Sequence, residues 1–109
     1  MREIKFRAWN GHNMELPIYD VSTQYGNKKL MQYTGLKDKN GVDIYEGDII
    51  KHYWESESDE GWECLPVFYD SDCAMFKAGD NELYLEEYAE DGEVIGNIYE
   101  NPELKEANQ

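Results

Sequence analysis

Residues 32–50, QYTGLKDKNGVDIYEGDII, decide the fold of this chain, and we call them the central stretch. They hold three glycines and four acids, a mixture typical of tight turns and also of loops that hold ligands. Asn40-Gly41 suits a two-residue type I′ turn between antiparallel strands, and Glu46-Gly47-Asp48 suits a second tight turn. We predict structural turns at five positions: Gly35, Asn40, Gly41, Gly47 and, further along the chain, Gly92.

The positions of the acids and glycines in the central stretch do not favour a ligand-holding role. A calcium loop beginning at Asp38 needs an oxygen ligand at its fifth position, Gly at its sixth and Glu at its twelfth, but Val42, Asp43 and Ile49 stand there. Neither of the common glycine-rich phosphate motifs occurs. We therefore interpret these residues as scaffolding, and we expect no metal ion and no cofactor.

Short extended segments recur along the rest of the chain. IKFRAW (4–9) alternates in the period-two pattern of a half-buried strand. Similar reasoning predicts extended segments at 14–21, 30–34, 42–45, 49–54, 64–69, 73–77 and 93–99. We expect a solvated acidic loop at 55–61 (ESESDEG), a three-residue hairpin loop at 70–72, and a helical turn or frayed tail at 103–109.

Residues 82–90, ELYLEEYAE, are the ambiguous segment. Leu83 and Leu85 alternate as in a strand, while Tyr84 and Tyr88 have the spacing of one helix face. We favour a strand here and keep the helix as the alternative. With turn signals every eight to twelve residues, the chain is predicted to be mainly β: an SH3-like small barrel or a compact β-sandwich of short antiparallel strands, with at most one short helix.

Charge is distributed unevenly over the 109 residues, whose formal net charge is −14. Residues 1–54 carry eight Lys/Arg and seven Asp/Glu, whereas residues 55–109 carry two Lys and seventeen Asp/Glu. A direct nucleic-acid partner is disfavoured, because binding phosphates draws on clusters of Lys and Arg. No apolar run approaches the length of a membrane span, and the N-terminus lacks the pattern of a signal peptide, so we expect neither a membrane nor secretion.

Catalytic chemistry has few candidate residues. His12 and His52 are the only histidines, and the close ligand pairs of a zinc site are absent. A Cys–His dyad of His52 with Cys64 or Cys73 stays open at this point, although both cysteines lie in strand-like apolar surroundings that favour packing in the reduced state. Adjacent carboxylates are abundant, and no pair stands out. We expect no catalytic residue and no enzyme.

Three separated segments resemble the YopX family of small phage and prophage proteins of Gram-positive bacteria: REIKFRAW (2–9), MQYTGLKDKNGVDIYEGDII (31–50) and EVIGNIYENPEL (93–104). The resemblance implies one compact, largely β domain over residues 1–109, a tendency to self-associate, and a place in the cytoplasm of a bacterial host. It supplies no catalytic residue. The acidic segment 55–92 matches no motif and lies between the segments that do.

We therefore expect a non-enzymatic protein that binds other proteins, as a homo-oligomer, through an acidic and aromatic surface. The alternatives are an acidic mimic of nucleic acid that inhibits a basic host protein, and a small metal-dependent hydrolase that uses clustered carboxylates. The residues predicted to make the surface are Trp54, Glu57, Asp59, Glu60, Trp62, Glu63, Tyr84, Glu86, Glu87, Tyr88, Glu90 and Asp91.

Overall fold

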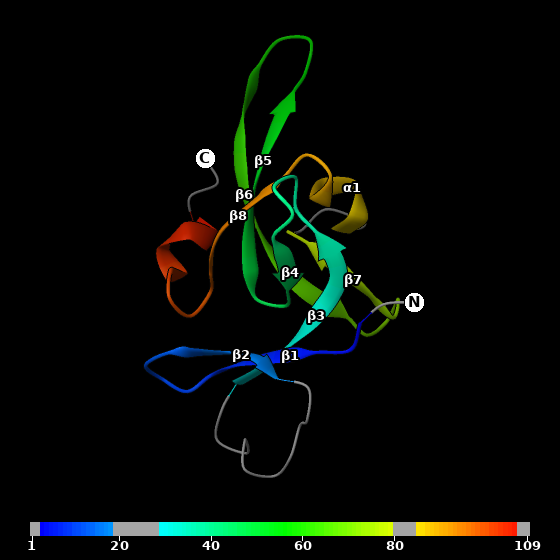
Figure 1. Cartoon of the computed structure of the whole chain (residues 1–109). Helices are drawn as coiled ribbons and strands as arrows, with labels where there is room; N and C mark the ends of the chain where they lie inside the picture. The colour runs from blue at the N-terminus through cyan, green and yellow to red at the C-terminus, as the bar shows by residue number, and fades with distance from the viewer. Residues whose placement is uncertain (1–2, 19–28, 80–84, 107–109) are drawn as a thin grey trace.

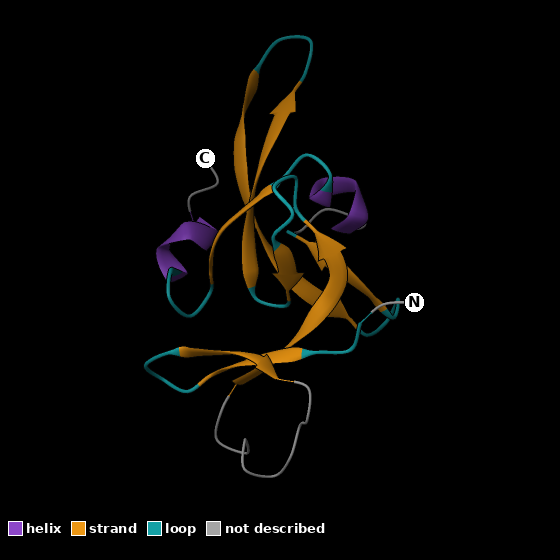
Figure 2. Ribbon diagram, in the orientation of Figure 1, coloured by secondary structure: helices purple, strands orange, loops and turns teal. Residues whose placement is uncertain are grey.

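The chain folds into two small antiparallel sheets, seen in a computed structural model that describes residues 3–18, 29–79 and 85–106 (Figure 1). The first sheet has the order β2-β1-β3-β4 and the second β7-β6-β5-β8. Together they make a curled half-barrel, which confirms the prediction of a mainly β fold with one short α-helix (Figure 2). The elements are β1 (Phe6–Trp9), β2 (Met14–Ile18), β3 (Lys29–Lys37), β4 (Asp43–Tyr45), β5 (Asp48–Glu55), β6 (Glu60–Asp70), β7 (Met75–Ala78), α1 (Leu85–Ala89), β8 (Glu93–Asn97) and the 3-10 helix η2 (Pro102–Glu106).

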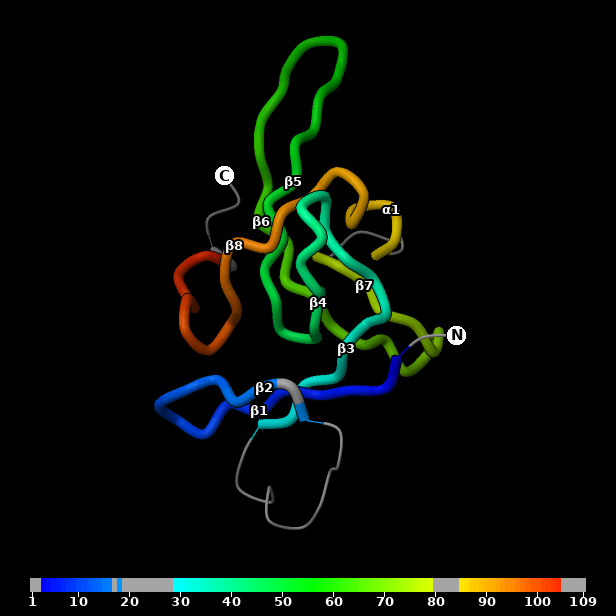
Figure 3. Tube along the Cα trace, in the orientation of Figure 1, coloured from blue at the N-terminus to red at the C-terminus, as the bar shows by residue number. Residues whose placement is uncertain are grey.

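The core lies where α1 closes over the second sheet and β4. Its buried residues are Ile44, Ile50, Leu65, Val67, Ala78, Leu85, Tyr88 and Ala89. Two parts of the molecule project from this core: the β5–β6 hairpin and, at the opposite end, the arm formed by β1 and β2 (Figure 3). Their projection explains a radius of gyration of 14.4 Å, somewhat above the roughly 13 Å of a compact domain of this length.

The prediction of a strand at 82–90 is wrong over residues 85–89, which form α1. Leu85, Tyr88 and Ala89 are buried, and their i, i+3, i+4 spacing turns one helix face inward. Glu86 and Glu87 lie in the first turn, where the helix dipole favours negative charge. Residues 82–84, with Tyr84, lie outside the described residues, as do parts of the segments predicted at 14–21 and 103–109.

The acidic loop predicted at 55–61 is shorter than expected. β5 runs to Glu55 and β6 begins at Glu60, so the connection is only residues 56–59. The two strands pair continuously from Ile49↔Pro66 to Glu55↔Glu60. Paired strands therefore carry the acidic sequence out into solvent as a ribbon. The predicted 64–69/73–77 hairpin is present as β6 and β7. Its predicted three-residue loop at 70–72 is wrong, because Asp70 still pairs with Met75 and the connection is residues 71–74.

Two predicted turns need correction. The β3–β4 turn is not type I′, because among the described residues outside glycine only Ala74 has a positive φ, whereas Asn40 would need one. Gly41 alone takes φ 82° there, and its N–H donates to the Asp38 carbonyl at 3.0 Å, as in a type I turn followed by a bulge. Gly35 lies within β3 at a shift in register, not in a turn.

The remaining turn glycines serve close packing. Gly47 has φ 88°, donates its N–H to the Val67 carbonyl and accepts from the Ile98 amide, each at 2.9 Å. Gly92 follows the turn after α1, and a Cβ there would lie 2.5 Å from Ile50 Cγ2. A Cβ at Gly47 would lie 3.0 Å from Met31 Sδ. A side chain at either glycine would therefore require a neighbouring side chain to move.

Candidate binding surfaces

The acids of the central stretch are all used inside the fold. Asp38 accepts hydrogen bonds from three amides: Asn40 at 2.8 Å, Val42 at 2.9 Å and Val94 at 2.9 Å. Glu46 Oε1 accepts from the Gln32 amide at 3.0 Å. These contacts close the β3–β4 turn and attach it to β8, which supports the scaffolding interpretation.

Asp48 and Arg7 form a buried ion pair in the same region. Arg7 Nη1 lies 2.8 Å from Asp48 Oδ1, and the Tyr45 amide donates to Asp48 Oδ2 at 2.7 Å. Burial raises the pKa of the Asp48 carboxyl, while the Arg7 charge and the Tyr45 amide act in the opposite direction. The guanidinium also lies over the Tyr45 ring. This pair ties β1 to the start of β5.

Asp43 is shared by two lysines. Lys5 Nζ lies 2.7 Å from Asp43 Oδ2, and Lys37 pairs with the other carboxylate oxygen. The Asp43 carboxylate raises the pKa of both ammonium groups. These bonds engage two of the few cations of the chain, so the first half of the molecule presents less positive charge than its composition suggests.

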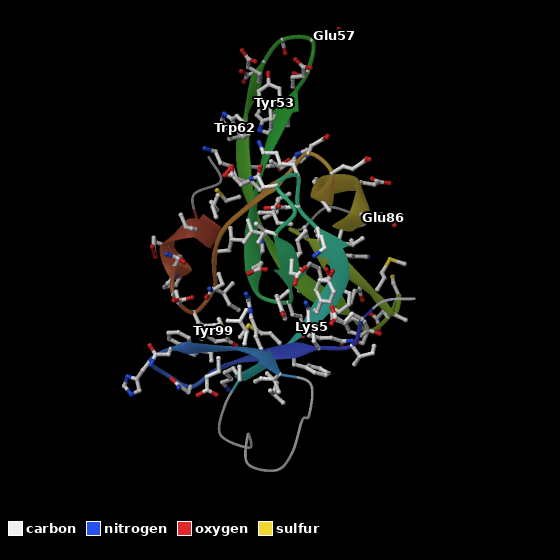
Figure 4. All side chains as sticks on the ribbon, in the orientation of Figure 1. Lys5, Tyr53, Glu57, Trp62, Glu86 and Tyr99 are labelled. Atoms are coloured by element: carbon white, nitrogen blue, oxygen red, sulfur yellow. The ribbon has the colours of Figure 1, made fainter. Side chains whose placement is uncertain are left out.

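The β5–β6 hairpin shows the opposite situation. Glu57, Asp59 and Glu60 are exposed near its tip, and within the described part of the chain no cation pairs with them. Figure 4 shows Glu57 at the extremity of the molecule, with Tyr53 and Trp62 below it on the same hairpin. Within the described residues, the carboxylates there do not tie the hairpin to other elements, whereas Asp38 and Asp48 join separate elements of the fold.

An aromatic pair occupies one face of the hairpin. Tyr53 and Trp62 are cross-strand partners whose rings meet edge to face at 5.2 Å, and Trp62 is 51% exposed. Lys51 Nζ lies 4.8 Å from the Trp62 ring centre, and the Tyr53 hydroxyl donates to Glu60. Sequence reasoning missed Tyr53 and Lys51. It predicted that the strand ends at residue 54, and it did not predict which residues of the next strand pair with Tyr53 and Lys51.

The opposite face of the hairpin turns toward α1. His52 meets the Tyr88 ring edge-on at 4.8 Å, and His52 Nδ1 lies 3.6 Å from Glu63 Oε2. Trp54 covers Gly61, where a Cβ would be 3.1 Å from the indole. Tyr88, 3% exposed, is a core residue and is not available to a partner, so placing it on a binding surface was wrong.

The predicted surface residues thus divide into two groups. One group, Trp54, Glu57, Asp59, Glu60, Trp62 and Glu63, lies on the hairpin. The other, Glu86, Glu87, Glu90 and Asp91, is exposed on and just after α1. Glu86 lies well away from the hairpin tip (Figure 4). The fold gives two separate acidic surfaces where the sequence predicted one.

Residues considered for catalysis are not brought together. Cys64 is the cross-strand partner of Lys51, and His52 pairs with Glu63, so Cys64 and His52 point to opposite faces of the ribbon. Neither cysteine forms a disulfide, and Cys73 is exposed with Lys77 Nζ 3.6 Å from its sulfur. Within residues 3–18, 29–79 and 85–106, no three His, Cys, Asp or Glu side chains gather closely enough to hold a metal ion.

Comparison with known proteins gives a family and one informative fold. The sequence matches the family described as YopX protein over residues 15–106. The structure is similar to the crystal structure of protein EF1440 from Enterococcus faecalis, with a TM-score of 0.68, 26% sequence identity, and coverage of 96% of this chain and 99% of that chain. No curated protein matches the sequence. In the described part of the chain no helix is long and apolar enough to cross a membrane.

Proposed function

The chain belongs to the YopX family, and we propose that it is a non-enzymatic protein-binding module whose β5–β6 hairpin docks on a basic surface of another protein. The observation that carries this proposal is the contrast in ion pairing: the carboxylates of the hairpin tip are exposed and pair with no described cation, while those of the central stretch are bound internally. The hairpin is also the part that projects farthest from the core (Figure 1).

Binding through this surface combines long-range and short-range contributions. The exposed carboxylates attract a basic partner and speed its approach, an effect that weakens as salt rises. Trp62 supplies the large, partly apolar contact typical of interface anchors. Lys51 on the Trp62 ring indicates that the indole face accepts a cation, so a partner Lys or Arg can displace it.

A separate basic partner fits better than a second copy of this chain. Of the described cations, Lys5, Arg7, Lys37 and Lys77 are engaged in ion pairs and Lys51 lies on Trp62. Lys29 and Lys39 are then the remaining described lysines whose side chains are exposed. Within the described residues, these two lysines make no basic face for the hairpin of another copy.

The basic groove of a nucleic-acid-binding protein is one surface of the required kind, since its Lys and Arg residues normally hold phosphates. In this version the hairpin carboxylates stand in for phosphates and block the groove. The phage origin implied by the family resemblance would put such a partner in the cytoplasm of a bacterial host, and we include this in the proposal.

The test compares matched charge-removing variants in a pull-down from host lysate. E57Q/D59N/E60Q removes three charges from the hairpin, and E86Q/E87Q/E90Q removes three from α1. We expect a basic protein that is retained by the wild type and by the α1 variant, lost by the hairpin variant, and released by high salt. Retention by the hairpin variant would refute the docking surface. Release by added duplex DNA would favour the mimic, and no effect of DNA would exclude it.

Self-association is a second proposal, and it rests on different residues. Leu16 on the edge strand β2 is 54% exposed, and Ile4, just before β1, is 57% exposed. We propose that copies meet through this apolar arm. Sedimentation should find the wild type larger than a monomer even at high salt, and Leu16→Lys monomeric. A monomeric wild type at high protein concentration would contradict it.

A further inference from the structure

A groove runs beside α1 and is separate from the aromatic face of the hairpin. Its more apolar part is a hollow of about 470 Å³ whose lining includes Leu36, Tyr69, Met75, Phe76 and Leu85. A second hollow continues from it along Glu86, Glu87 and Glu90, and the two share Leu36 and Glu86. We call these residues together the α1 groove.

The floor of the groove continues the core face of the second sheet. Tyr69 pairs with Phe76, two positions beyond the pair of Val67 and Ala78, so these side chains lie on one face of β6 and β7. Val67 and Ala78 are buried, whereas Tyr69 is 45% exposed. Tyr69 and Phe76 meet edge to face at 5.1 Å. The apolar face of β6 and β7 therefore continues beyond its buried part into a part that the described residues leave exposed. Exposed apolar surface of this kind is typical of interaction sites.

The rim of the groove is acidic. Glu86 and Glu87 are exposed on α1 and Glu90 just after it, and no cation in the described ranges pairs with them. Lys37, on the facing strand, is already bound to Asp43. An apolar floor with an uncompensated acidic rim is complementary to a segment that carries both apolar and basic side chains.

An open sheet edge borders the same hollow. β7 is the terminal strand of its sheet and, among the described strands, pairs only with β6. Met75 and Phe76 of β7 line the hollow. An extended guest can add to such an edge through main-chain hydrogen bonds while alternate side chains enter the groove.

We propose that the α1 groove binds an extended protein segment in which apolar residues alternate with Lys or Arg. The apolar side chains enter the hollow over Tyr69 and Phe76. The intervening Lys or Arg side chains start from the other face of the guest strand, and their long flexible stems let the charged ends reach round to the carboxylates of the rim. This site is independent of the proposed function of the hairpin, because the Tyr53–Trp62 face points away from α1.

The direct experiment is an NMR titration of the isotope-labelled chain with the peptide Lys-Leu-Lys-Leu-Lys. We expect the largest amide shifts at Leu36, Phe76 and Glu86. Two matched peptides separate the contributions: Lys-Ser-Lys-Ser-Lys keeps the charge without the apolar side chains, and Glu-Leu-Glu-Leu-Glu reverses the charge. Each should bind at least about tenfold more weakly.

Matched variants complete the test. E86Q/E87Q/E90Q should weaken binding of the leucine–lysine peptide about tenfold, because each of the three lost surface ion pairs contributes roughly a factor of two in affinity. E57Q/D59N/E60Q, which removes as many charges at the hairpin, should leave the affinity measured from the Leu36 and Phe76 shifts unchanged. Equal weakening by both variants, shifts confined to the hairpin, or equal binding of the serine peptide would each overturn the proposal. None of these results would refute capture of a partner by the hairpin, which the pull-down tests separately.

Discussion

The central stretch and the β5–β6 hairpin are both rich in acids, yet they use them in opposite ways. Asp38, Asp43 and Asp48 each bind backbone amides or cations inside the fold. The acids at the hairpin tip face water, and no cation in the described part of the chain pairs with them. Their hydrogen bonds stay within the hairpin, from the Glu60 amide to Asp59 and from the Tyr53 hydroxyl to Glu60. The comparison teaches that the number of acids in a segment says little about function. What matters is whether turns and neighbouring strands bring donors to them.

The largest expected effect comes from the buried pair of the central stretch. Asp48→Ala removes the partner of Arg7 and leaves a buried guanidinium without its counter-charge. We expect a loss of about 3–5 kcal/mol in the free energy of unfolding, measured by urea denaturation. Asp48→Asn, which keeps an oxygen for the Tyr45 amide, should lose less. A loss below about 1 kcal/mol for Asp48→Ala would show that the pair is not structural.

Asp38 should give the next largest effect. Asp38→Ala deprives the amides of Asn40, Val42 and Val94 of their acceptor. Leaving such donors unsatisfied should cost roughly 2–3 kcal/mol in the free energy of unfolding. Hydrogen exchange should also accelerate at Val94, because that amide loses the Asp38 carboxylate as its acceptor. Normal protection there would contradict the role assigned to Asp38.

The same carboxylate predicts a dependence on pH. Partial burial favours the neutral acid, but the hydrogen bonds from Val94, Val42 and Asn40 outweigh it, so the pKa of Asp38 lies below its ordinary value of 3.8. A lowered pKa stabilises the fold above the ordinary pKa, and the stabilisation is lost as pH falls through the lower, folded value. The stability difference between wild type and Asp38→Asn should therefore be constant near neutral pH and shrink below pH 3.8. A difference that grows with acid would reverse this sign.

The smallest effect is expected on the hairpin. Trp62→Ser removes exposed contacts with Tyr53 and Lys51, which together should contribute about 0.5–1 kcal/mol to stability. Partner capture in the pull-down should nevertheless fall sharply. Thermal unfolding and capture are to be measured on the same preparation, with Leu30→Ser as a control for loss of an exposed apolar residue elsewhere. Parallel loss of both properties would mean that Trp62 supports the fold.

Much of the fold could be predicted from the sequence, because period-two alternation and glycine turns are local signals. The strands at 42–45 and 49–54 and the β6–β7 hairpin follow from such signals. α1 was not predicted because Leu83 and Leu85 have the alternating spacing of a strand. The buried helix face formed by Leu85, Tyr88 and Ala89 depends on packing against the sheet, which is not a local signal. The type I′ turn was wrong because the Asp38 carboxylate, by accepting from the turn amides, favours a different turn at Asn40.

The candidate surfaces were less predictable than the fold. Exposed acids near 57–60 and 86–91 were identified, but their separation into two surfaces depends on where the ribbon and α1 lie in space. Tyr53 joins the hairpin surface through its cross-strand pairing with Trp62, and that pairing was not predicted from the sequence. The floor of the α1 groove combines β3, β6, β7 and α1, and no local pattern reports such long-range contacts.

The central claim is tested most directly by urea unfolding of two matched triple variants. D38N/D43N/D48N and E57Q/D59N/E60Q each remove three negative charges from a chain of net charge −14. We predict that the first loses at least about 4 kcal/mol of unfolding free energy or fails to fold. The second should stay within about 0.5 kcal/mol of the wild type, or gain slightly because self-repulsion falls. Comparable losses in the two variants would contradict the account.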